Sequence, residues 1–372
     1  MLNSSRDAYH SGQTRPRHLL SSGRKLVFEA AGALQALFGT PASTRRAIAD
    51  IERDAGVALS IRGGEVTLKG DAEACARVEA ALRDIYRLGQ QGRPIRPEDI
   101  GRALAVATKV PEGGLEACFG DVLATRRGGR PVTPRSLAQK RYVEAIRQGA
   151  LTFGVGPAGT GKTYLAVCMA ARRLLDRDVR RIILTRPAIE AGENLGFLPG
   201  TFEDKVSPYM RPIYDSLFDL IDPPKVHRMV EQGIIEIAPL AYMRGRTLSE
   251  AFVILDEAQN TTPQQMKMFL TRLGERTTAV VTGDPSQVDL PRGQRSGLVD
   301  ALDILSGVQT VSVQRFTAGD VMRHPLVEDI IRAYDAAARR RATRTREGGM
   351  ASTAAATRGE EDDARGSAGA GS

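Results

Sequence analysis

From about residue 136 onward, short runs of apolar residues alternate with longer segments in which apolar positions recur every three or four residues. The short runs predict strands that are buried on both faces, and the longer segments predict helices that connect them. The predicted strands are 151–156, 181–186, 233–239, 251–257, 278–284 and 308–313. This order predicts an α/β fold with a predominantly parallel sheet.

A shorter alternation between residues 25 and 92 predicts a separate, small α+β domain. Apolar periodicity predicts one helix at 43–54 and a second at 71–86. Between them, residues 57–61 and 65–70 alternate as strands do, and two glycines supply the turn. We therefore expect the order helix–strand–strand–helix.

The rest of the chain has the composition of tails and a linker. Residues 1–24 are polar and basic, and residues 336–372 are rich in Ala, Arg, Gly and Ser, so we expect both to be disordered. Residues 93–135 hold five prolines and the basic run TRRGGRPVTPR, which is typical of a linker. That run fits either a solvated connector or a strap that contacts nucleic acid.

Composition narrows the class of protein further. The net charge of +8 favours phosphate-rich partners such as nucleic acid, although an Arg-rich composition alone also accounts for it. Three cysteines without metal-ligand spacing argue against a disulfide framework and fit a reducing cytoplasm. No apolar run approaches the roughly 20 residues of a membrane span. We therefore expect a cytoplasmic protein without a membrane partner.

The segment GPAGTGKT, residues 156–163, matches the P-loop pattern G-x-x-x-x-G-K-[ST] in full and lies between a predicted strand and helix. Its backbone amides and the helix N-terminus are placed to surround the phosphates of a nucleotide. We expect Lys162 to reach the β- and γ-phosphates of ATP and the Thr163 hydroxyl to bind Mg²⁺. The nucleotide-binding residues predicted here are Gly156, Pro157, Ala158, Gly159, Thr160, Gly161, Lys162 and Thr163.

Two later strands end in polar residues that a P-loop site needs. The run AFVILDEAQN places Asp256 as a second Mg²⁺ ligand and Glu257 to polarise the attacking water, although alone it reads as an ordinary strand end. The run AVVTGDPSQVDLP follows, in which Asp284 or Gln287 is placed to sense the γ-phosphate. Taken alone, Gly-Asp-Pro is a common turn.

Residues outside these strands complete the predicted site. Gln139, on a helix before the P-loop strand, is placed to pair with adenine through its amide, unless it is a surface residue. Arg315 and Arg323 are candidates for an arginine finger, in cis or from a neighbouring subunit, unless they are solvated. The predicted catalytic residues are therefore Lys162, Glu257, Arg315 and Arg323.

Together these segments resemble the PhoH-like protein family. The matching segments are GPAGTGKTYLA, TRPAIEAGENLGFLPG, LDEAQNTTPQQMKMFLTR, VTGDPSQVDLP and DVMRHPLV. The resemblance implies that residues 136–335 form a RecA-like P-loop NTPase domain related to the first motor domain of superfamily 1 helicases. It also implies that Thr185-Arg186-Pro187 begins a segment that contacts nucleic acid in helicases.

The resemblance also bears on partners. The block 25–92 resembles a KH-like RNA-binding domain in its element order, but it has no GXXG clamp between two helices. A superfamily 1 helicase needs a second RecA-like domain, and the stretch after residue 335 is short and of low complexity. We therefore expect a homo-oligomer, such as a ring, in which the next subunit supplies Arg315 or Arg323.

The function expected from the sequence is ATP binding with Mg²⁺-dependent hydrolysis, coupled to RNA or single-stranded nucleic acid. One alternative is a nucleotide-switched binding or scaffold protein in which turnover is incidental. A small-molecule kinase is a further alternative, but Glu257 and Gln287 favour hydrolysis over transfer to a metabolite.

Overall fold

The computed structural model describes residues 23–28, 40–90, 100, 103–104, 114–187, 202–291, 293–322, 327, 330 and 334. The chain divides into two units, residues 1–320 and 321–372. The predicted tails 1–24 and 336–372 lie outside the described residues, except for Gly23 and Arg24. In the part of the chain that is described, no helix is long and apolar enough to cross a membrane.

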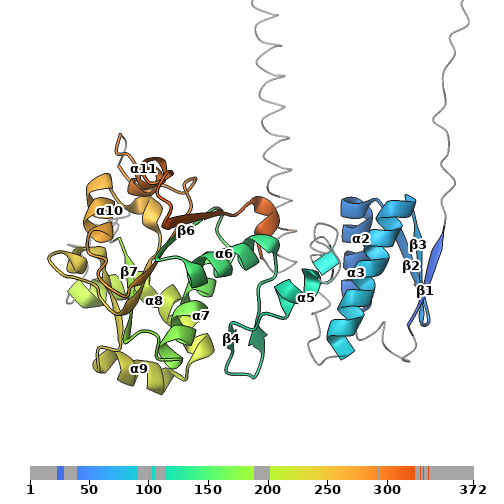
Figure 1. The fold of residues 1–372 in the computed structure, drawn as a ribbon, viewed down its shortest axis with the longest axis horizontal. Coiled ribbons are helices and arrows are strands. Elements are labelled where there is room, and N and C mark those ends of the chain that lie inside the picture. The colour runs from blue at the N-terminus through green and yellow to red at the C-terminus, as the bar shows by residue number, and fades with distance from the viewer. Residues whose placement is uncertain are drawn as a thin grey trace, which may run out of the picture. The chain divides into compact units, whose positions relative to one another are not determined.

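A six-stranded sheet carries the P-loop (Figure 1). Its strand order is β11-β6-β10-β9-β7-β8, and every neighbouring pair is parallel. The fold class predicted from the sequence is therefore confirmed. The strands are β6 Leu151–Val155, β7 Arg181–Arg186, β8 Ile235–Pro239, β9 Ala251–Leu255, β10 Thr278–Gly283 and β11 Val311–Arg315.

The last predicted strand is displaced along the chain. The apolar pattern predicted it at 308–313, whereas β11 begins at Val311. The Val308 amide donates to the Leu305 carbonyl, and the Val311 amide donates to the Val308 carbonyl, so Val308 belongs to a turn. Valines lie both in the turn, at Val308, and in the strand, at Val311 and Val313, so the apolar pattern did not separate the two.

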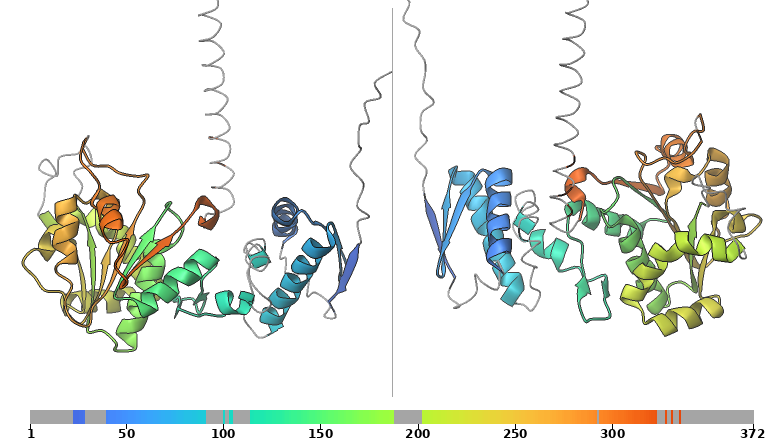
Figure 2. Two further views of the ribbon diagram at one scale, coloured as in Figure 1. Left: turned by 45° about the horizontal axis from the view of Figure 1, so that its top comes forward. Right: turned by 180° about the vertical axis from the view of Figure 1, so that it is seen from behind.

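Helices cover both faces of the sheet (Figure 2). Successive strand residues point to opposite faces, and in β7 Ile182 and Leu184 belong to one core while Ile183 belongs to the other. The helices whose buried residues join the first core are α6 Leu137–Gln148, α7 Lys162–Leu175, α8 Phe202–Leu220 and α9 Pro223–Glu231. The second core is closed by η3 Leu240–Met243, η4 Ala258–Asn260, α10 Pro263–Leu270 and α11 Gly297–Ile304. All six strands therefore end at one edge, where loops can form a ligand site.

The N-terminal α+β unit has a three-stranded antiparallel sheet of order β1-β3-β2, with two helices against it (Figure 1). Its elements are β1 Arg24–Val27, α2 Pro41–Ala55, β2 Ala58–Arg62, β3 Glu65–Lys69 and α3 Ala72–Gln90. The predicted helix–strand–strand–helix order is present, but β1 was not predicted. Because β1 begins at Arg24, the prediction that this residue belongs to a disordered tail was wrong. The likeness to a KH-like domain stays a prediction.

The region predicted as a linker, 93–135, contains regular structure where it is described. The basic run forms the turn of a β-hairpin, in which the Arg126 amide donates to the Arg130 carbonyl at 2.8 Å. The elements of this region are α5 Gly114–Phe119, β4 Ala124–Thr125 and β5 Pro131–Val132, and a short loop then leads to α6. The described part of this region is therefore not a wholly solvated connector.

The hairpin is attached to the large sheet domain by the buried Val132, by the Arg127 amide, which donates to the Asp219 carbonyl, and by Arg126. Arg126 Nε lies 3.1 Å from Asp219 Oδ2 on α8, and its guanidinium lies over the Tyr164 ring at 5.2 Å from the centroid. The Tyr164 hydroxyl donates to the same carboxylate. Arg127 and Arg130 at the tip are exposed, so the prediction that they contact nucleic acid stays open.

Candidate functional site

The P-loop connects the end of β6 to the start of α7. Gly156, Gly159 and Gly161 have φ angles of +143°, +80° and +83°, a region in which side chains are strained. A Cβ at Gly156 would lie 2.4 Å from the Phe316 carbonyl oxygen, and one at Gly161 would lie 3.0 Å from Gln139 Nε2. Glycine is therefore required here both by conformation and by close approach.

Lys162 lies folded into the curve of this loop. Its ammonium donates to the carbonyls of Gly156 at 2.6 Å and Pro157 at 2.7 Å. Burial lowers the pKa of Lys162, and the negative charges of three nearby carboxylates oppose that shift. The lysine is thus a buried cation held by backbone oxygens beside an acidic strand end.

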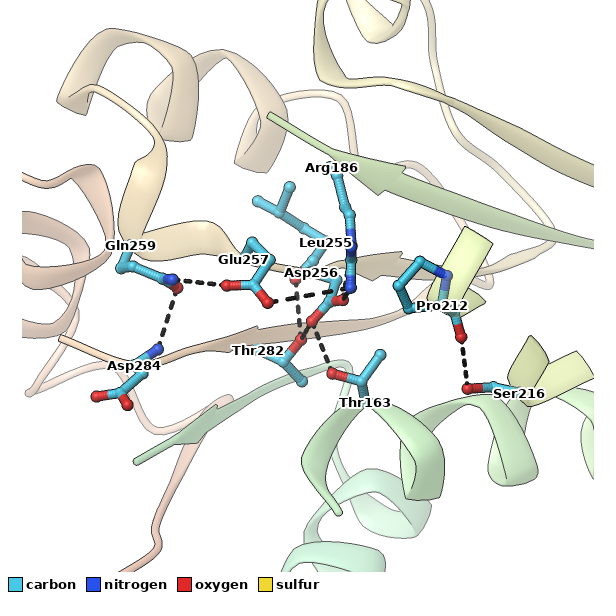
Figure 3. Close-up of polar contacts among 10 residues, drawn as sticks. All are labelled: Thr163, Arg186, Pro212, Ser216, Leu255, Asp256, Glu257, Gln259, Thr282 and Asp284. Carbon is cyan, nitrogen blue, oxygen red and sulfur yellow. Dashed lines mark hydrogen bonds and ion pairs between the residues drawn. The ribbon is translucent and has the colours of Figure 1, made fainter. Parts of the chain in front are cut away.

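Asp256, directly after β9, is the meeting point of four elements (Figure 3). Its Oδ1 accepts hydrogen bonds from the hydroxyls of Thr163 and Thr282, each at 2.7 Å. Its Oδ2 accepts from Arg186 Nε at 2.8 Å and from Arg186 Nη2. Because Asp256 is only 3 % exposed, these bonds compensate the cost of burying its charge.

Glu257 has a backbone conformation that is unusual for a residue with a side chain. Its φ and ψ are +55° and +37°, in the left-handed region, at a cost of about 1–3 kcal/mol. The side chain is 45 % exposed, and Glu257 lines the cavity described below. Strain of this kind, observed at the end of a buried strand, is typical of functional sites.

Gln259 connects the ends of β9 and β10 (Figure 3). Its Nε2 donates to Glu257 Oε2 at 2.6 Å, and its Oε1 accepts from the Asp284 amide at 3.0 Å. A Cβ at Gly283 would lie 2.7 Å from Gln259 Oε1, so glycine leaves the room this amide needs. Asp284 Oδ1 accepts from Ser286, whereas Oδ2 is buried without a hydrogen-bond partner among the described residues.

These groups line a cavity of about 290 Å³ at the edge where the strands end. That volume is close to the lower limit for small-molecule sites, about 300 Å³. The predicted residues that line it are Ala158, Gly159, Gly161, Lys162, Thr163, Asp256, Glu257, Asp284 and Gln287. The lining residues that were not predicted as part of this site are Tyr164, Arg186, Pro212, Ser216 and Gly283.

The other predicted P-loop residues, Gly156, Pro157 and Thr160, support the cavity without lining it. Gln139 is 4 % exposed and does not line it either. Its Oε1 accepts from the Arg135 amide at 2.7 Å, and its Nε2 donates to the Thr160 carbonyl at 2.9 Å. The amide predicted to pair with adenine is therefore bonded to the P-loop itself.

Of the two predicted arginine-finger candidates, one lies within the described residues. Arg315 is the exposed last residue of β11 and is not among the residues lining the cavity. Arg323 lies outside the described residues. Neither observation assigns a finger, so both stay predictions.

The predicted nucleic-acid contact at Thr185-Arg186-Pro187 is arranged differently from the expectation. The Thr185 side chain is fully buried, and Arg186 points to Asp256 rather than outward (Figure 3). The rest of that segment, residues 188–200, lies outside the described residues. The strand register explains the difference, because Thr185 is paired with Leu255. The next residue along each chain segment is Arg186 and Asp256, respectively, so these two side chains meet.

The pair of Thr163 and Asp256 fits a Mg²⁺ site. A hydroxyl and a carboxylate are oxygen ligands of the kind that Mg²⁺ prefers, and their oxygens lie 2.7 Å apart. Among the residues described, no group of three or more His, Cys, Asp or Glu side chains could hold a metal alone. Mg²⁺ at this place would therefore need phosphate oxygens, as in sites where it binds together with a nucleotide.

A parallel sheet, a P-loop between strand and helix, and an acidic strand end bonded to the P-loop threonine define a P-loop nucleotide-binding protein. The chain belongs to the PhoH-like protein family, whose sequence profile matches residues 131–335. The resemblance identified in the sequence is therefore confirmed.

Three relatives illustrate how much of the chain is shared. The PhoH-like protein of Bacillus subtilis (strain 168) is 45 % identical over 318 residues, which cover 86 % of this chain and 98 % of that protein. The PhoH-like protein of Mycobacterium tuberculosis (strain ATCC 25618 / H37Rv) is 48 % identical over 285 residues, covering 76 % of this chain and 80 % of that one. Protein PhoH of Escherichia coli (strain K12) is 42 % identical over 272 residues, covering 73 % and 75 %.

Among solved structures, the chain is similar to the Sulfolobus solfataricus SWI2/SNF2 ATPase core in complex with dsDNA. The sequence identity is 13 %, the TM-score is 0.30, and the match covers 53 % of this chain and 45 % of that one. A likeness at this level carries no argument about function.

Proposed function

We propose that this protein hydrolyses ATP with the help of Mg²⁺. The observation that carries the proposal is the hydrogen bond from Thr163 to Asp256, with the strained Glu257 next in the chain and facing the same cavity. A P-loop site that only bound phosphate would need the Thr163–Asp256 pair alone. Hydrolysis also needs a group that positions the attacking water, and the Glu257 carboxylate at the cavity is such a group. This arrangement favours hydrolysis over transfer to a metabolite.

Each of these side chains has a role in the proposal. Lys162 leaves its carbonyl partners to bind the β- and γ-phosphates, while Thr163 and Asp256 hold Mg²⁺, directly or through water. Mg²⁺ supplies charge neutralisation at the phosphate oxygens. Glu257, oriented by Gln259, positions the attacking water, and Gln287 at the rim of the cavity contacts the γ-phosphate.

We also propose that the functional form is a homo-oligomer, such as a ring. Arg315 is exposed on β11, which is an edge strand of the sheet, and it does not line the cavity of its own chain. An arginine in that place is suited to reach a neighbouring subunit and stabilise transition-state charge there. Arg323 remains the second candidate.

The proposed partner that couples to hydrolysis is RNA or single-stranded nucleic acid. The net charge of +8 supports a polyanionic partner. The α+β unit within residues 25–92 is the proposed RNA-binding domain, and the proposed ATPase domain follows it along the chain at 136–335. All three cysteines are buried free thiols. That state supports a place in a reducing cytoplasm.

A nucleotide-switched scaffold is the second candidate function. It rests on Asp256, which follows β9 and accepts hydrogen bonds from residues of β7, β10 and the P-loop. A ligand bound at this one carboxylate would therefore affect all four elements together. In that case ATP occupancy, rather than turnover, would change the protein's binding properties.

Steady-state ATP hydrolysis by the full chain, with and without single-stranded RNA, tests both candidates. Glu257→Gln is compared with Glu275→Gln, an exposed glutamate outside the site. We expect RNA to raise turnover by the wild type and by Glu275→Gln, and Glu257→Gln to lose about 10²–10⁴-fold in rate. Turnover that ignores RNA would reject the coupling, and equal, very slow turnover by all three proteins despite ATP binding would favour the switch.

A further inference from the structure

We propose that Arg186 is a resident counter-ion of Asp256 that competes with the divalent cation, so that the metal binds strongly only together with a nucleotide. The inference rests on the proposed function of Asp256 as a metal ligand. It gives Arg186 a role at the nucleotide site, whereas the sequence resemblance implied a contact with nucleic acid at this residue.

The geometry places the guanidinium where a cation would otherwise be attracted. Arg186 is the last residue of β7, and both Nε and Nη2 donate to Asp256 Oδ2, while Nη2 also lies 4.0 Å from Glu257 Oε1. The two carboxylates that would attract a metal therefore already face a fixed positive charge.

Burial makes this pairing strong. The Arg186 side chain is 15 % exposed and that of Asp256 is 4 % exposed, so water screens the pair little. Charge-assisted bonds from two guanidinium nitrogens are among the stronger hydrogen bonds in proteins. A divalent cation at Asp256 would either lie within a few ångströms of this guanidinium or displace it, and both are costly.

The arrangement differs from a purely structural ion pair. Glu236 on β8 also forms a bidentate ion pair, with Arg246 in the loop after η3, but neither residue lines the cavity. Arg186 does line it, so its head has space to leave Asp256 toward arriving phosphate oxygens. The phosphates then supply both the missing metal ligands and a new partner for the arginine.

The consequence is a linkage between metal and nucleotide. Without nucleotide, the metal must compete with Arg186 and has only two protein oxygens from Thr163 and Asp256. With nucleotide, the arginine has another partner and the metal has additional ligands. Removing the charge at position 186 should thus strengthen metal binding mainly in the nucleotide-free protein.

Mn²⁺ is a suitable probe because its binding to the full chain can be followed by electron paramagnetic resonance without any turnover. The variant is Arg186→Gln, and the control is Arg181→Gln, which removes the same charge from the opposite end of the same strand. Each protein is titrated with Mn²⁺ alone and with a non-hydrolysable ATP analogue. Arg186→Met serves if Arg186→Gln does not fold, as judged by circular dichroism.

We expect Arg186→Gln to bind Mn²⁺ about tenfold or more tightly than wild type without nucleotide, as removal of an adjacent like charge requires. The difference should shrink with the analogue, and Arg181→Gln should match the wild type. Adding Asp256→Asn to Arg186→Gln should abolish the gain. Unchanged nucleotide-free affinity in the variant, alongside normal binding with the analogue, would overturn only this inference, whereas no Mn²⁺ binding by any protein with the analogue would overturn the proposed metal site as well.

Discussion

The Thr163 hydroxyl donates a hydrogen bond to Asp256 Oδ1 at 2.7 Å, although the two residues are 93 positions apart in the chain. Thr163 lies in the first turn of α7 and Asp256 directly follows β9. The bond joins the P-loop helix to the acidic strand end through a nearly buried carboxylate. The two motifs therefore form one site in the folded chain.

This bond predicts how substitutions of Thr163 will behave. Thr163→Val keeps the shape but removes the hydroxyl that bonds Asp256 and that is proposed to bind Mg²⁺. A hydrogen bond to a charged group is worth about 1.5–3 kcal/mol, so kcat/KM should fall by about 10–100-fold or more. Thr163→Ser keeps the oxygen and should retain most activity. Hydrolysis measured over a Mg²⁺ titration checks this, and equal activity of the Val and Ser variants would contradict it.

Gln259 provides a prediction about orientation rather than binding. Gln259→Ala removes the donor to Glu257 and leaves the buried Asp284 amide without its acceptor, which costs about 1–3 kcal/mol of stability. We expect kcat to fall while KM for ATP changes little, because the phosphate-binding loop is untouched. Gln259→Glu should be at least as damaging to kcat, since it places a second carboxylate against Glu257.

Gln264→Ala is the matched control for that experiment, because Gln264 is an exposed residue of the nearby helix α10. Its melting temperature and its kcat should equal those of the wild type. If Gln259→Ala loses stability but keeps a normal kcat, Gln259 has only a structural role.

Substitution of Gln139 distinguishes two roles for this residue, support of the P-loop and recognition of adenine. Since its amide bonds the Thr160 carbonyl and the Arg135 amide, we expect Gln139→Ala to weaken binding of ATP and GTP alike, by about 1 kcal/mol for a lost hydrogen bond. An adenine contact would instead weaken ATP binding selectively. Competitive binding of both nucleotides to both proteins decides, and a changed ATP-to-GTP ratio would favour the adenine contact.

The apolar pattern predicted the four inner strands of the large sheet well because they are buried on both faces. In β9, for example, all five residues are buried, and a continuous apolar run of that length leaves few alternatives. The strand β1 gave no such signal, because it buries only Leu26 of its four residues and its partner β3 lies far along the chain. Pairing across that distance is not encoded in a local pattern.

The site, like the fold, was predictable from the sequence where it depends on local motifs. The P-loop and the Asp256–Glu257 pair follow from local sequence, because phosphate binding needs those residue types at fixed spacing. The partnership of Arg186 with Asp256 was not predictable, since it depends on the register that pairs Thr185 with Leu255. The register of Val281 with Leu255 likewise brings Thr282 to Asp256. Sequence patterns predict the strands, whereas such side-chain contacts require the register between them.

Asp121, in the loop before β4, predicts a pH-dependent contribution to stability. Its carboxylate accepts from Lys140 Nζ at 2.8 Å and from two nitrogens of Arg147 at 2.7 and 2.8 Å. Burial alone would raise the pKa of Asp121, but the hydrogen bonds from these two cations outweigh it and lower the pKa. A carboxyl whose pKa is lowered by folding stabilises the protein above its unfolded pKa, about 3.9, and loses that contribution as the pH falls through the folded value.

Asp121→Asn should therefore lower the free energy of unfolding at pH 7, by about 1 kcal/mol because the two cations are partly exposed and screened. The same substitution should matter progressively less below pH 4, where the wild-type carboxyl also takes up a proton. Urea unfolding of both proteins across this pH range measures the difference directly. Asp178→Asn, at an exposed aspartate after α7, should show no comparable pH-dependent loss. A loss for Asp121→Asn that is the same at pH 7 and at pH 3 would mean that the carboxylate charge does not contribute.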